Sequence, residues 1–83
     1  MRRYFFDVER DSVFELDAEG VELKSILHVR KYALQVLSEV LAEDATHLEA
    51  VSAQVRVRDE CQNVFSMQLA LETTSHTSGP PAV

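Results

Sequence analysis

The sequence contains no tryptophan, one cysteine, two glycines and two prolines among its 83 residues. A single thiol, Cys61, cannot form an internal disulfide, which excludes a disulfide-rich secreted scaffold. No apolar run approaches the roughly 20 residues of a membrane-spanning helix. Positive charge is also scarce, because eight basic residues against 14 acidic ones give a net charge of −6. Such a chain repels nucleic-acid phosphate unless its few cations gather on one surface.

The apolar content is sufficient for one small core. Hydrophobic residues make up 46% of the chain, which is above the content of disordered proteins. In a domain of this length, core burial only narrowly outweighs the entropy lost on folding, so we expect further stability from homo-oligomerisation. We also expect a cytoplasmic protein, because charged residues follow the N-terminal arginines where a signal peptide would be apolar.

Two pairs of strands are predicted from alternating apolar and polar residues. The first hairpin uses residues 4–9 and 13–16, and the second uses residues 51–58 and 64–71. Gly20 follows the first hairpin and is expected to adopt a positive φ angle. From residue 73 the chain is small, polar and proline-terminated, which predicts a disordered tail over residues 73–83.

Between the hairpins, residues 26–44 have the period of an amphipathic helix, with Ser25 as the N-cap. The resulting ββαββ order predicts an α+β domain over residues 1–72. Its single four-stranded antiparallel sheet would carry the helix on one face.

One basic side chain, Arg30, falls inside the apolar arc of this helix, between Leu37 and Leu41. An unpaired buried guanidinium is too costly, so Arg30 either reaches past the sheet edge or meets a carboxylate. We interpret it as a partner of Asp17 or Glu19, which would tie the preceding loop to the helix. The alternative is a binding site for an anionic ligand.

Several short motifs resemble those of a known family. They are RYFF at the N-terminus, D-x-E-G-x-E-L over residues 17–23, VRKYAL in the helix, and VRVRDE followed by VF. Together they resemble a family of short bacterial proteins that is described as a domain of unknown function. This resemblance supports the fold and implies no activity. In outline, the domain is also similar to the antitoxin half of some bacterial toxin–antitoxin pairs.

No catalytic or metal-binding pattern is evident in the sequence. The acidic neighbours of Cys61 disfavour its thiolate, and the three histidines lack metal-ligand spacing. Asp17 and Glu19 supply too few oxygens for a calcium loop, and we interpret them as a turn that places negative charge near the helix N-terminus. We therefore expect neither enzymatic activity nor a cofactor.

The predicted function is that of a non-catalytic protein-interaction module that forms a homodimer. Arg56 and Arg58 share the open sheet face with Asp7 and Glu9, so opposite charges could pair across a two-fold axis. An unpaired sheet edge offers a second route to a dimer. The alternative is a small nucleic-acid-binding regulator that uses Arg56 and Arg58, or an antitoxin-like partner protein.

Overall fold

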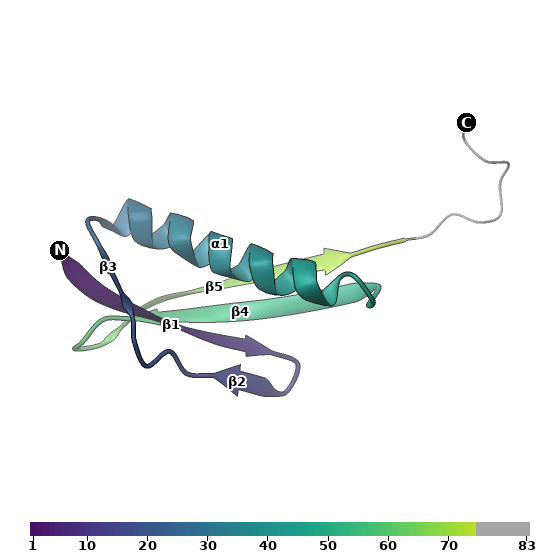
Figure 1. Cartoon of the computed structure of the whole chain (residues 1–83), viewed down its shortest axis with the longest axis horizontal. Helices are drawn as coiled ribbons and strands as arrows, with labels where there is room; N and C mark the ends of the chain where they lie inside the picture. The colour runs from purple at the N-terminus through teal and green to yellow at the C-terminus, as the bar shows by residue number, and fades with distance from the viewer. Residues whose placement is uncertain (75–83) are drawn as a thin grey trace, which may run out of the picture.

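The structure is a computed structural model that describes residues 1–74 of the chain as one helix on one face of an antiparallel sheet (Figure 1). The helix is α1 (Ile26–Asp44). The strands are β1 (Arg2–Arg10), β2 (Val13–Glu15), β3 (Val21–Leu23), β4 (Ala50–Arg58) and β5 (Asn63–Glu72). The main strand order is β2-β1-β4-β5, and β3 also pairs with β1.

Helix α1 has the predicted bounds. Ser25 is its N-cap, with an extended backbone and a side-chain oxygen that accepts a hydrogen bond from the backbone N–H of His28 at 3.4 Å. At the other end, the backbone N–H of Ala45 donates to the carbonyl of Leu41 at 2.8 Å. The buried residues of the helix recur at every fourth position, as expected for a helix that packs on a sheet. They are Val29, Ala33, Leu37 and Leu41.

The core lies between α1 and the two central strands, β1 and β4. The predicted alternation holds in both strands, because every second side chain is buried on the helix side. These residues are Tyr4, Phe6 and Val8 of β1 and Val51, Ala53, Val55 and Val57 of β4. The ring of Phe6 lies 4.7 Å from that of Tyr32, which joins β1 to one side of α1.

The predicted four-stranded sheet is incomplete, because the structure contains a fifth strand. Strand β3 pairs with the first part of β1, where Arg2 faces Leu23, and β2 pairs with the last part, where Val8 faces Glu15. The two short strands therefore follow one another along the same edge of β1. Three residues beside Gly20 are too few to establish an alternating pattern, which is why the sequence does not reveal β3.

The second hairpin extends slightly beyond its predicted end. The backbone N–H of Thr73 donates to the carbonyl of Glu49 at 2.6 Å, which continues the pairing of β4 and β5. The predicted disordered tail lies outside the described residues from residue 75 onward. Among the residues that the structure describes, no helix has the length and apolar character needed to cross a membrane.

Candidate functional site

The first candidate region is a charged cluster on the sheet face opposite α1, formed by Asp7, Asp17 and Arg58. Asp7 is only 3% exposed, and the Nε of Arg58 donates to its Oδ2 at 2.8 Å. Nη2 of Arg58 donates to the carbonyl of Asp17 at 2.9 Å. The guanidinium also lies 4.5 Å above the ring centre of Phe5, within the range of a cation–π interaction. The hydrogen bond to Asp7 raises the pKa of Arg58.

Asp17 fills the gap that β2 and β3 leave along the edge of β1. Its Oδ2 accepts a hydrogen bond from the backbone N–H of Phe6 at 3.0 Å, and its own N–H donates to Oδ1 of Asp7 at 2.9 Å. Burial alone would raise the pKa of Asp17. The hydrogen bonds from the backbone of Phe6, Gly20 and Glu19, together with Arg58, outweigh this effect and lower the pKa of Asp17. The carboxylate thus substitutes for a neighbouring strand.

Gly20 allows this loop to lie close against β1. It has the predicted positive φ angle, 73°, and a Cβ at this position would lie 2.9 Å from side-chain carbons of Arg3 and Phe5. Nη1 of Arg3 donates to the carbonyl of Glu19 at 2.8 Å, on the same loop. The D-x-E-G sequence therefore forms a tight closure of the β1 edge.

The polar atoms of this charged cluster form hydrogen bonds with one another and with the neighbouring backbone. Within residues 1–74, no buried side-chain nitrogen or oxygen lacks a hydrogen-bond partner, and no three metal-ligating side chains gather. The pairing that we predicted between subunits, Arg58 with Asp7, occurs within one chain. The alternation of residues showed that the two share a face, but it could not show in which chain they meet. Arg56 is exposed and forms no ion pair in the described part of the chain.

The predicted pairing of Arg30 with Asp17 or Glu19 is wrong. Arg30 is exposed, and the carboxylate of Asp17 accepts hydrogen bonds from the backbone instead. The physical reason is that the buried stripe of α1 runs through residues four positions apart, from Val29 to Leu41, and so shifts around the helix by about 40° at each step. Three other residues of the predicted arc are also exposed: Ile26, Leu27 and Leu34. Arg30 directly follows Val29 and lies about 100° away from it around the helix, so it is outside the buried stripe at this end of α1.

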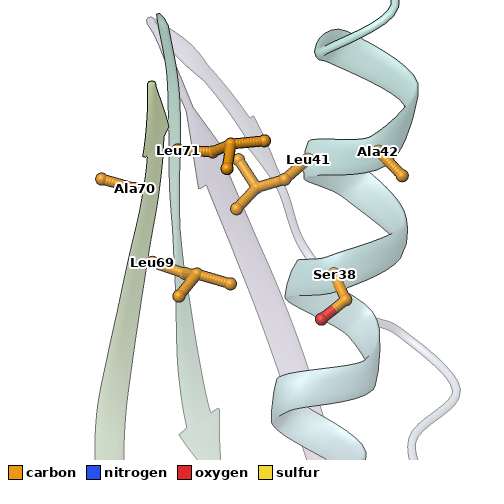
Figure 2. Close-up of a pocket in the computed structure, with 6 residues that line it drawn as sticks. All are labelled: Ser38, Leu41, Ala42, Leu69, Ala70 and Leu71. Atoms are coloured by element: carbon orange, nitrogen blue, oxygen red, sulfur yellow. The ribbon is translucent and has the colours of Figure 1, made fainter. Parts of the chain in front are cut away.

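The second candidate region is an apolar groove between α1 and β5 (Figure 2). It is an open hollow of about 260 Å³, lined by Ser38, Leu41, Ala42, Leu69, Ala70 and Leu71. Figure 2 shows the side chains of Leu41 and Leu71 directed toward one another, with that of Leu69 below them. The only polar side chain in the lining belongs to Ser38, so the groove offers hydrophobic contact and no evident chemistry.

Exposed leucines extend this groove along the helix. Leu27, Leu34 and Leu41 are spaced seven residues apart, which places them on one side of α1. Leu27 is 57% exposed and Leu34 is 48% exposed, while Leu71 of β5 is 46% exposed. The helical period places Leu27 and Leu34 in the apolar arc of α1, on the side expected to face the sheet. The width of the predicted arc was the signal that part of the apolar side of α1 lies outside its contact with the sheet.

Strand β5 forms the open edge of the sheet beside the groove. In the described structure it pairs with β4 alone, and residues 63–71 contain no charged side chain. Charged residues, prolines and bulges are the usual means by which proteins protect an exposed edge strand. The one irregularity lies at the beginning of β5, beside Val57 and Arg58 of β4. Over the rest of β5, the described part of the chain shows none of these protections.

The turn between β4 and β5 contains the single thiol of the chain. Oδ1 of Asp59 accepts hydrogen bonds from the backbone N–H groups of Cys61 and Gln62, both at 2.8 Å. These hydrogen bonds lower the pKa of Asp59 and close the turn without a glycine. Cys61 is exposed beside this turn. We interpret Asp59 as a structural residue.

Comparison with known proteins gives a family and no activity. Residues 3–70 match the family described as Domain of unknown function (DUF6894). The chain belongs to the DUF6894 family. The match includes the charged cluster, the helix and nearly all of β5. No curated protein and no solved structure matches the chain.

Proposed function

We propose that this protein is a non-catalytic interaction module of the cytoplasm that associates with a second copy of itself. The observation that supports this function best is the apolar groove beside an unprotected sheet edge. A contiguous apolar surface on a small soluble domain is typical of a binding surface, whereas single exposed leucines are not. Here the groove, the leucine row of α1 and the β5 edge adjoin one another.

The charge distribution favours a protein partner over nucleic acid. Of the two arginines that β4 places on the open sheet face, Arg58 is already paired with Asp7. Arg56 forms no ion pair in the described part of the chain. One exposed arginine on this face, in a chain with a net charge of −6, provides little attraction for phosphate. The groove itself is uncharged, and nucleic-acid contact surfaces are strongly basic.

Sedimentation velocity over micromolar concentrations in moderate salt tests this proposal. We expect a dimer that dissociates on dilution, and we expect Leu34→Gln to weaken it because Leu34 belongs to the exposed leucine row. Leu16→Gln is the matched control, since Leu16 is exposed outside the groove, next to β2. A monomer at every concentration would contradict self-association. Equal weakening by both substitutions would contradict the groove as its location.

A further inference from the structure

We infer that two copies join through β5, antiparallel, about a two-fold axis at Gln68, and form one continuous sheet with both α1 helices on the same face. This inference rests on the proposed self-association and specifies its geometry. In this arrangement, the β5 edge of each chain pairs with the β5 edge of the other. The observations that support it are the directions of the backbone groups of β5, the pattern of its side chains and the position of the leucine row.

The backbone of β5 presents a regular set of free groups at the open edge. The hydrogen bond from the N–H of Thr73 to the carbonyl of Glu49 shows that Thr73 points toward β4. Because antiparallel strands alternate, Met67, Leu69 and Leu71 also direct their backbone groups toward β4. The backbone groups of Ser66, Gln68 and Ala70 then point outward. Their side chains are uncharged and exposed, and they leave the edge accessible.

The side chains of β5 select one register. An axis at Gln68 places Phe65 opposite Leu71 of the second copy and Met67 opposite Leu69 of the second copy. All four of these apolar side chains lie on the helix side of the sheet, because their β4 partners are the buried valines and alanine. Moving the axis by one residue places either Leu71 opposite Asn63 or Phe65 opposite Thr73. Only the axis at Gln68 pairs the four with one another.

The helices support the same axis. Helix α1 packs against β4 and β5, and neighbouring strands are about 4.8 Å apart, so the two helices would be roughly 10–15 Å apart across the axis. Leucine side chains that project from both helices can fill such a space. Leu34 lies near the middle of α1 and one turn before Ser38 of the groove. Burial against the second copy would cover it together with Leu71.

The distribution of charge explains why copies meet at this edge. Two chains of net charge −6 repel one another, and residues 63–71 of β5 are the uncharged segment that permits close approach. The opposite side of the sheet ends in β2 and β3, which are only three residues long each and are separated by the loop of Asp17. Within the described residues, β5 is therefore the one long edge strand available for sheet extension, and a two-fold axis pairs it in both copies at once.

Thiol cross-linking tests the register directly. In a Cys61→Ser background, Gln68→Cys places two thiols on the axis, on strands about 5 Å apart. Gln54→Cys is the matched control, because Gln54 faces Gln68 on the adjacent β4 and would be three strand spacings from its copy. With a short bifunctional maleimide, we expect Gln68→Cys to cross-link at least about tenfold faster than Gln54→Cys, owing to its higher effective concentration.

Further variants separate the register from the association itself. Ser66→Cys mixed with Ala70→Cys should cross-link rapidly, and each alone should cross-link slowly, because the axis at Gln68 pairs position 66 with position 70. Equal rates for Gln68→Cys and Gln54→Cys in a protein that sediments as a dimer would overturn the β5 pairing and leave self-association intact. Fastest cross-linking of Ser66→Cys alone would overturn the register. A monomer in sedimentation would overturn both proposals.

Discussion

Strands β1 and β5 differ in whether the chain itself supplies hydrogen-bond partners for the backbone groups that face away from β4. At the β1 edge, β2 and β3 pair with the strand, and the carboxylate of Asp17 accepts the hydrogen bond of Phe6 in the gap between them. At the β5 edge, the backbone groups of Ser66, Gln68 and Ala70 face outward beside an apolar groove. One edge is completed by the chain itself. We infer that the other is completed by a second copy.

The two edges also differ in charge, because charged side chains stabilise the β1 edge and are missing from most of β5. The charged cluster of Asp7, Asp17 and Arg58 binds the loop to β1 and to β4. The β5 edge has no charge between residues 63 and 71. Substitutions at the β1 edge should therefore lower the free energy of unfolding, and substitutions at the β5 edge should change association.

The largest effect is expected at Asp7, the buried member of the charged cluster. Asp7→Ala removes the acceptor for Arg58 and for the backbone N–H of Asp17, and should lower the free energy of unfolding by roughly 3 kcal/mol. Denaturant unfolding followed by circular dichroism measures the change. Glu9→Ala is the control, because Glu9 is exposed on the same face of β1 and should change stability by less than about 0.5 kcal/mol. Similar losses for both would contradict a structural role for the cluster.

Gly20→Ala is expected to have the next largest effect. A side chain at φ 73° is strained and would contact Arg3 and Phe5, so the free energy of unfolding should fall by about 2 kcal/mol. Gly20→Asn separates the two causes, since asparagine tolerates a positive φ angle but carries the same Cβ. A smaller loss for Gly20→Asn indicates backbone strain, and equal losses indicate the close contact. No loss in either variant would contradict the tight closure of the β1 edge.

Asp17 should make a pH-dependent contribution of intermediate size to the free energy of unfolding. Its pKa is lowered in the folded state, so its stabilisation is complete above the unfolded pKa of about 4 and is lost as the pH falls through the folded pKa. Asp17→Asn should therefore cost about 1.5 kcal/mol at neutral pH, the scale of hydrogen bonds to a charged group. Urea unfolding at several pH values should show the two proteins converging in acid. A constant difference at all pH values would argue against a charged Asp17.

The smallest change in the stability of the folded monomer is expected for a substitution on the side of α1 next to β5. Leu34 is 48% exposed, so Leu34→Gln should change the free energy of unfolding by less than about 0.5 kcal/mol at concentrations where the protein is monomeric. At dimer-forming concentrations the same variant should be less stable than the parent protein. A large loss in the monomer would show that Leu34 belongs to the core after all.

Much of this fold follows from local sequence patterns. The N-cap Ser25 and the 3.6-residue period define α1, and the alternation of β4 identifies its buried valines. Strand β3 could not be predicted, because three residues carry no period and their pairing depends on the distant Arg2 and Tyr4. Such pairing is a property of the assembled sheet.

The candidate regions were predicted less well than the fold. The sequence indicated that Gly20 takes a positive φ angle and that Asp7 and Arg58 share a sheet face. It did not reveal that the two meet within one chain, because the alternation gives the face and not the distance. Arg30 was misplaced for a related reason: a helical wheel superimposes all the turns of α1, whereas the buried stripe from Val29 to Leu41 shifts around the helix from turn to turn.

Amide hydrogen exchange in β5 tests the difference between the edges most directly. The N–H groups of Met67 and Leu69 point toward β4 and should be protected at every protein concentration. Those of Ser66, Gln68 and Ala70 should exchange rapidly in dilute protein and become protected as the concentration rises and the dimer forms. Rapid exchange of Ser66, Gln68 and Ala70 at high concentration, equal to that in dilute protein, would contradict the closure of the β5 edge by a second copy.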